Sequence, residues 1–149
     1  MSDRTLRVAV AALAAIGAGI AAYVTYARYT DATIACSTGG CEAVQSSDYA
    51  ELLGIPVAVL GLGAYLVLLA TSFSKGDLAR MTGAVVAVSG VLFAVYLLYA
   101  QIFLIDAVCQ WCVASDALIS LLAVASVLRL RSRQSDDPTA GVEVHPLRG

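Results

Sequence analysis

The feature that most constrains this chain is a series of four apolar runs, each about long enough to cross a lipid bilayer. A transmembrane helix needs about 20 apolar residues. The runs cover about residues 6–26, 55–73, 81–105 and 108–128, and the fourth contains one charged residue, Asp116. Only 13% of the residues are charged, whereas soluble domains carry about 25%. The sequence therefore predicts an all-α integral membrane protein, a four-transmembrane-helix bundle.

Charged residues near the ends of the runs predict how the chain is oriented. Basic residues gather on one predicted side: Arg4, Arg7, Lys75, Arg80, Arg129, Arg131 and Arg133. The other side has Arg28 against five acidic residues. By the positive-inside rule, both termini of this multi-pass protein are cytoplasmic, and the 30–54 loop and the turn near Asp106 face outward. The first run is longer than the apolar core of a cleaved signal peptide, which favours a retained helix.

Two further patterns concern packing and domain limits. Small residues recur four positions apart, a spacing that lets helices approach closely in lipid: Ala11, Ala15 and Gly19, then Gly83 and Ala87, then Gly90 and Ala94. Residues 132–149 are polar and contain two prolines. We expect a transmembrane domain over residues 1–131 and a disordered cytoplasmic tail over residues 132–149.

The four cysteines form two pairs, and both pairs fall on the predicted outer side. Cys36 and Cys41 lie in the first outer loop, separated by Ser-Thr-Gly-Gly, and Cys109 and Cys112 form Cys-Gln-Trp-Cys where the fourth run begins. Thiol–disulfide chemistry belongs to oxidising compartments outside the cytoplasm. This distribution indicates a thiol–disulfide relay at the outer face of the membrane.

The two pairs have different local chemistry. Cys109 and Cys112 share one face of a helix, and a helix N-terminus stabilises a thiolate. Asp106 and Asp116 act in the opposite direction, and the sequence leaves open which effect is larger. Gly39 and Gly40 make the loop pair flexible, as a shuttle requires. A disulfide that closes so short a loop stabilises the fold little.

Other interpretations of the cysteines remain open at this point. Both pairs could be inert disulfides, or all four cysteines could hold a structural zinc ion. A protease with a cysteine–histidine pair is excluded, because the single histidine, His145, lies in the polar tail. Trp111 fits an interfacial aromatic belt or a surface that packs on a ring cofactor.

The segment after Cys41 predicts a short amphipathic helix in the first outer loop. Asp48 followed three residues later by Glu51 fits a capping box. Gly54 then ends the helix, and Pro56 opens the second run. Such a helix lies on the membrane surface and could act as a lid above the bundle.

At this level the chain resembles the bacterial branch of the vitamin K epoxide reductase family. The features that carry the resemblance are the four runs, the loop cysteine pair, Ser47 six residues after Cys41, the Gly-Ile-Pro at residues 54–56, and the Cys-Gln-Trp-Cys motif. The resemblance covers about residues 6–128. Two departures stand out: the loop pair is closely spaced, and Asp116 stands where vertebrate relatives have a tyrosine that contacts the quinone.

The resemblance implies a membrane oxidoreductase that transfers electrons from thiols to a lipid quinone, ubiquinone or menaquinone, and so supports disulfide bond formation. Cys109 and Cys112 would be the active-site pair, with Cys112 nearest the quinone. Ser47 and Asp116 would be quinone-binding, although Asp116 could instead reach water. Cys36 and Cys41 would accept electrons from an extracytoplasmic thioredoxin-fold protein resembling DsbA, a separate partner because no thioredoxin domain follows the runs. Such a protein would lie in the bacterial inner membrane, with its site on the periplasmic or extracellular face.

Three alternatives to this function remain. A DsbB-like protein is close in mechanism, but there the Cys-x-x-Cys pair lies in the first outer loop, the reverse of the order here. A tetraspan scaffold without catalytic activity, or a metal permease with cysteine ligands, would also explain apolar runs with cysteines at one end.

Overall fold

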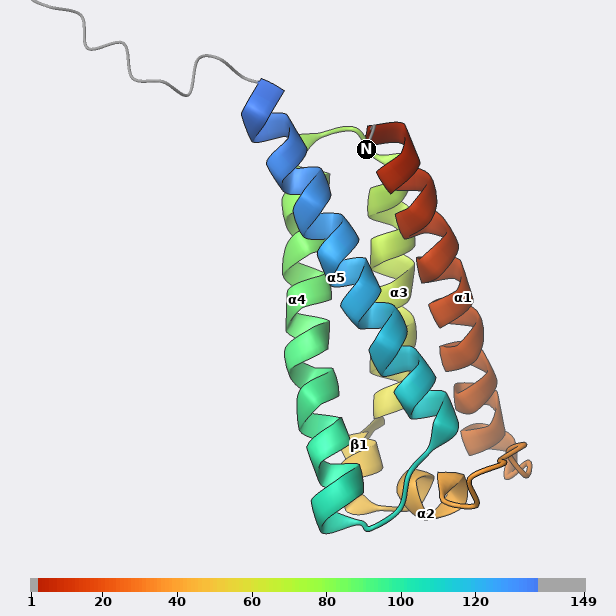
Figure 1. Cartoon of the computed structure of the whole chain (residues 1–149). Helices are drawn as coiled ribbons and strands as arrows, with labels where there is room; N and C mark the ends of the chain where they lie inside the picture. The colour runs from red at the N-terminus through yellow and green to blue at the C-terminus, as the bar shows by residue number, and fades with distance from the viewer. Residues whose placement is uncertain (1–2, 137–149) are drawn as a thin grey trace, which may run out of the picture.

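The computed structural model describes residues 3–136, and its helices run the length of the molecule (Figure 1). The elements in chain order are α1 (Asp3–Thr30), α2 (Cys41–Gln45), the 3-10 turn η1 (Asp48–Ala50), β1 (Glu51–Leu52), β2 (Ile55–Pro56), α3 (Val57–Phe73), α4 (Asp77–Tyr99), the π-helical turn η2 (Ala100–Leu104) and α5 (Gln110–Asp136). The four long helices coincide with the four predicted apolar runs.

Three helical segments are long and apolar enough to cross a membrane: α1, α4 together with η2, and α5. The fourth, α3, is apolar but has only 17 residues. At 1.5 Å per residue that is about 25 Å, slightly less than the roughly 30 Å hydrocarbon core. The Arg7 guanidinium donates from Nε to the carbonyl of Ser72 at 2.9 Å and from an Nη to that of Phe73 at 3.1 Å. These bonds satisfy carbonyls that the end of α3 leaves without partners within the helix.

The helices pack in a closed ring, α1 against α3, α3 against α4, α4 against α5 and α5 against α1. Tyr65 of α3 is the largest fully buried side chain at their centre. Its ring packs against Gly17 of α1, where an added Cβ would lie 2.2 Å from a ring carbon. Its hydroxyl donates to the carbonyl of Ser115 on α5 at 2.9 Å. Tyr65 therefore joins three helices, and only glycine fits at position 17.

The prediction for small residues is confirmed on α4 and wrong on α1. Gly83, Ala87 and Ala94 are buried between helices, and Gly90 of α4 packs closely on Ile119. On α1, however, Ala15 and Gly19 are exposed on the outer surface. The buried small residues there are Ala14, Gly17, Ala21 and Ala27. Tyr65 determines which face of α1 turns toward the other helices, because its ring requires the space that Gly17 leaves.

The prediction that the loop helix begins at Asp48 is wrong. The loop helix is α2, which begins at Cys41, whereas Asp48 starts a single 3-10 turn with no side-chain cap. Glu51 instead pairs with Arg28 at the end of α1, Nη to Oε1 at 2.6 Å. It also begins a two-stranded hairpin whose turn, Leu53 and Gly54, has positive φ at both residues. Gly54 therefore makes a hairpin turn and does not end a helix.

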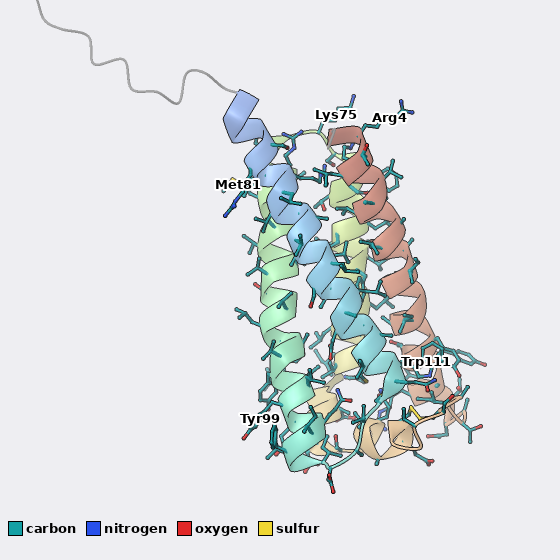
Figure 2. The ribbon with its side chains drawn as sticks, viewed as in Figure 1. Arg4, Lys75, Met81, Tyr99 and Trp111 are labelled. Carbon is teal, nitrogen blue, oxygen red and sulfur yellow. A yellow bond between two sulfur atoms is a disulfide. The ribbon has the colours of Figure 1, made fainter. Side chains whose placement is uncertain are left out.

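The two ends of the bundle differ in their side chains (Figure 2). Arg4 and Lys75 lie at one end, and Tyr99 and Trp111 lie at the other, beside the loop that connects α1 to α3. At the first end α5 continues past Ser132 to Asp136, so the start of the segment predicted as a disordered tail is helical. The remainder of that predicted tail, residues 137–149, lies outside the described residues.

Candidate thiol–disulfide site

Cys109 occupies the N-cap of α5, immediately before the first helical residue, Gln110. Its carbonyl accepts the backbone N–H of Val113 at 3.0 Å, and its Sγ accepts the backbone N–H of Cys112 at 3.4 Å. The sulfur thus takes the place of the side-chain oxygen that usually caps a helix. Both Cys109 and Cys112 are free thiols, Cys109 buried and Cys112 partly buried.

The hydrogen bonds around the Cys109 sulfur decide the direction in which its pKa is shifted. The Cys112 thiol, donating a hydrogen bond to the sulfur, contributes most to lowering the pKa of Cys109 to about 6, with smaller contributions from the backbone N–H groups of Cys112 and Trp111 and the Gln45 amide. Burial acts the other way and is outweighed. Hydrogen bonds to the charged form favour it. Cys109 is therefore prepared to exist as the thiolate, the form that reacts in disulfide exchange.

Cys36 and Cys41, the loop pair, are joined in a disulfide. They lie against Cys109 and Cys112, which we call the helix pair. Cys36 and Cys41 are bonded, with their Cα atoms 6.0 Å apart. Cys41, the first residue of α2, is fully buried in one apolar cluster with Cys109 and Val44. Cys36 and Cys112 pack on the edge of the same cluster. The tertiary structure therefore brings all four predicted cysteines into one site.

Four hydrogen bonds attach the loop to the start of α5. Gln110 accepts the N–H of Ser37 at 2.9 Å and donates to the carbonyl of Ala35 at 3.3 Å. Trp111 Nε1 also donates to the Ala35 carbonyl, at 2.7 Å. The Thr38 hydroxyl donates to the carbonyl of Val108 at 2.8 Å. The Gln-Trp between the two cysteines thus holds the loop over them.

The two loop glycines have separate structural roles. Gly39 has a φ of +74°, a left-handed conformation that favours glycine. At Gly40 an added Cβ would lie 2.6 Å from the Val108 carbonyl oxygen. The sequence suggested flexibility at both positions. In the folded chain Gly40 allows the loop backbone to touch the segment that carries Cys109.

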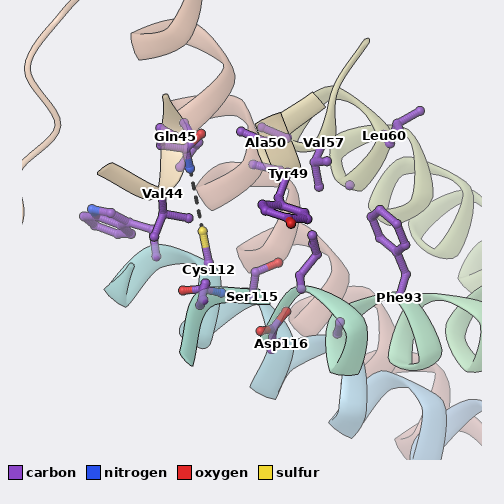
Figure 3. Close-up of a pocket in the computed structure, with 18 of the residues that line it drawn as sticks. Val44, Gln45, Tyr49, Ala50, Val57, Leu60, Phe93, Cys112, Ser115 and Asp116 are labelled. Atoms are coloured by element: carbon purple, nitrogen blue, oxygen red, sulfur yellow. Dashed lines mark hydrogen bonds between the residues drawn. The ribbon is translucent and has the colours of Figure 1, made fainter. Parts of the chain in front are cut away.

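Two glutamines that the sequence analysis did not single out contact the helix pair. Gln101, buried in the π-helical turn, accepts the backbone N–H of Cys109 through Oε1 at 2.9 Å. The Gln45 amide nitrogen lies 3.6 Å from the Cys112 sulfur and 4.0 Å from the Cys109 sulfur (Figure 3). Gln45 follows Cys41 by one helical turn. This spacing points to a role beside the cysteines only when α2 is known to span residues 41–45.

A cavity of about 270 Å³ opens below the helix pair, walled by all four long helices and covered by α2, η1 and β1. Its lining is mostly apolar and includes Trp111, whose ring packs on Tyr23 with centroids 5.1 Å apart. Cys112 lies in the wall, and its sulfur points toward Gln45 (Figure 3). The sulfur of Cys112 therefore lies between the cluster of cysteines and the apolar cavity.

The two predicted binding residues both line this cavity. The Ser47 hydroxyl donates to the carbonyl of Val44 at 2.7 Å, so its proton is directed away from the cavity. Asp116 lies one turn below Cys112. Its Oδ2 is buried and has no hydrogen-bond partner within the described residues. A buried polar atom without a partner is uncommon in proteins, so Asp116 is the better candidate to meet a polar group of a ligand.

A metal centre does not fit the residues that the structure describes. They contain no cluster of three or more histidine, cysteine, aspartate or glutamate side chains suited to hold an ion. Two of the four cysteines are joined in a disulfide, and a zinc ligand has to be a free thiolate.

Comparison with known families agrees with this geometry. The model of the vitamin K epoxide reductase family matches residues 8–127, which include every element of the site. The chain belongs to the vitamin K epoxide reductase family. Family membership indicates a membrane thiol oxidoreductase linked to a quinone. The four cysteines of the chain, Cys36, Cys41, Cys109 and Cys112, all lie within the matched residues.

Proposed function

We propose that this protein is a four-span membrane oxidoreductase that reoxidises an extracytoplasmic, DsbA-like thioredoxin-fold protein and passes the electrons to a lipid quinone. The observation that carries the proposal is the convergence of two cysteine pairs on one buried cluster at the edge of an apolar cavity. A scaffold needs no such convergence, and a permease needs a metal-ligating set.

The proposed orientation places this cluster at the outer face of the bacterial inner membrane. Trp111 lies at the opposite end of the bundle from Arg4 and Lys75 (Figure 2), and the two cysteine pairs share its cluster. Basic residues favour the cytoplasmic side. With α3 as the fourth span, both termini are cytoplasmic and the outer loop contacts soluble partners.

The difference in burial between Cys36 and Cys41 supports separate roles for the two loop cysteines. Cys41 is 1% exposed and shares its cluster with Cys109, whereas Cys36 is only partly buried, beside the exposed residues Ser37 and Thr38. An incoming protein thiol reaches Cys36 more readily than Cys41. We therefore assign Cys36 to the partner and Cys41 to Cys109.

The relay then consists of balanced exchange steps. A partner thiolate attacks Cys36 Sγ and breaks the Cys36–Cys41 bond, and the second partner thiol completes the partner's own disulfide, leaving both loop cysteines reduced. The Cys41 thiolate attacks Cys109 Sγ in the Cys109–Cys112 disulfide, and Cys112 leaves as a thiolate. Cys36 then attacks Cys41, which re-forms the loop disulfide and releases Cys109. Two electrons and two protons have moved from the partner to the helix pair.

The structure corresponds to the state after this internal transfer, with a loop disulfide and a reduced helix pair. The apolar lining, the Cys112 sulfur in the wall and the unpaired Asp116 oxygen fit a quinone ring with its carbonyl groups. A protonated Asp116 carboxyl would donate to a ring carbonyl beside Cys112, and Ser47, whose hydroxyl already donates to Val44, would line the site. A bound quinone supplies the final two-electron, two-proton acceptor, so that the Cys109–Cys112 disulfide re-forms.

The decisive experiment compares the purified wild-type protein with the Cys112→Ala variant. Wild-type protein should oxidise a reduced DsbA-like substrate in the presence of ubiquinone or menaquinone, with quinol formed in equal amount. Cys112→Ala should reduce no quinone, while the exposed neighbour variant Val113→Ala should retain turnover. Normal turnover by Cys112→Ala would exclude the relay, and no turnover by wild type would favour a scaffold.

A further inference from the structure

Gln45 lies at the junction of the two cysteine pairs. It is the last residue of α2, the helix that begins with Cys41, and its amide nitrogen reaches the Cys112 and Cys109 sulfurs at 3.6 and 4.0 Å (Figure 3). The helix that delivers the loop sulfur therefore also delivers a hydrogen-bond donor to the helix pair.

The two distances are unequal, and the shorter one is to Cys112. Cys109 already accepts the backbone N–H of Cys112 at 3.4 Å from the helix N-terminus. Cys112 is the third residue of α5, beyond the cap that holds Cys109. The Gln45 amide therefore supplies a hydrogen-bond donor to the Cys112 sulfur, which is placed less well than Cys109 to accept the backbone N–H groups at the start of α5.

We propose that Gln45 is a positioning residue that donates a hydrogen bond to the departing Cys112 thiolate and so determines which sulfur of the helix pair is released. This inference rests on the proposed relay. When Cys41 attacks Cys109, the Cys109–Cys112 bond breaks and its electron pair stays on Cys112. The Gln45 amide stabilises that charge because it carries two N–H donors and no charge of its own.

The same amide favours the reduced form of the pair, because it reaches both sulfurs and can donate to whichever one carries the negative charge. A disulfide sulfur is a poor acceptor, whereas a thiolate is a strong one. Removing the donor should therefore shift the thiol–disulfide equilibrium of Cys109–Cys112 toward the disulfide. A hydrogen bond of ordinary net strength corresponds to about a fivefold change in an equilibrium constant.

The test uses the full-length protein with Cys36→Ser and Cys41→Ser, so that only the helix pair reacts. Two quantities are measured: the equilibrium constant against reduced and oxidised glutathione, and the ultraviolet absorbance of the thiolate at fixed pH. Gln45→Leu should shift the equilibrium about fivefold toward the disulfide and lower the thiolate absorbance. Gln45→Glu keeps the size of the side chain but adds a negative charge, and it should shift both quantities further in the same direction.

Ser46→Ala is the matched control, because Ser46 is exposed beside Gln45 at the end of α2 and its hydroxyl donates to the carbonyl of Ala43 at 3.3 Å. This variant should leave both quantities near the wild-type values. The inference is overturned if both Gln45 variants behave like wild type, or if Ser46→Ala shifts the quantities equally, which would assign the effect to a general disturbance of α2. Neither measurement requires quinone, so a protein that fails to reduce quinone would refute the proposed function while still testing Gln45.

Discussion

The two cysteine pairs of this protein differ in almost every physical respect. Cys36 and Cys41 close a short loop and are joined in a disulfide, whereas Cys109 and Cys112 are free thiols at the start of a long helix. Cys36 is partly accessible at the surface, and Cys109 is fully buried. In the proposed relay, the first pair would contact a protein partner and the second would carry out thiol chemistry away from water. Cys41 connects them, because it belongs covalently to the first pair and packs with the second.

The largest expected effect comes from replacing each of the two loop cysteines in turn. Cys36→Ser should abolish turnover and accumulate a disulfide between Cys41 and Cys109, because the thiol that would resolve it by attack on Cys41 is missing. Cys41→Ser should also abolish turnover, but should form a mixed disulfide between Cys36 and the oxidised partner. Peptide mapping of non-reduced protein identifies each bond. Finding Cys36 bonded to Cys109 would reverse the assignment.

The next effect concerns the acidity of the helix pair. In reduced protein carrying Cys36→Ser and Cys41→Ser, the thiolate absorbance of Cys109 should develop as the pH rises through about 6. Adding Cys112→Ala removes the largest cause of the lowered pKa, so the transition should move upward toward the ordinary value of 9.0. An unchanged transition would mean that the helix N-terminus alone sets this pKa.

A smaller loss should follow from Gly40→Ala, which breaks the contact between the two regions. The added Cβ meets the Val108 carbonyl oxygen at 2.6 Å, so the loop has to move away from Cys109. Overpacking of this kind costs about 1–3 kcal/mol, and we expect turnover to fall roughly tenfold or more if that cost falls on the transfer step. Gly39→Ala also strains the loop but has nothing within 4 Å of its Cβ, so a similar loss there would contradict the contact explanation.

The smallest expected effect is at the cavity. Asp116→Asn replaces the unpaired carboxyl oxygen with an amide and should change the KM for quinone by about three- to tenfold, the usual range for one hydrogen bond. The rate of Cys41–Cys109 exchange, followed without quinone, should stay constant. A change in exchange with no change in KM would place Asp116 in the relay instead of the binding site.

The sequence by itself determined the membrane class, because long apolar runs leave little choice but to cross a bilayer or pack as core. It also placed both cysteine pairs at the same end, since charge bias and run order fix which connections share a side. These features depend on composition and order along the chain, so they are visible without coordinates.

Only the tertiary structure decided the local arrangement. The loop helix begins at Cys41 and not at Asp48, because Glu51 pairs with Arg28 and Gly54 turns a hairpin. The contacts from Gln45 and Gln101 to the helix pair join residues that no sequence period relates. Such contacts depend on how helices from distant parts of the chain meet. Their geometry is set by close packing, which a linear pattern does not contain.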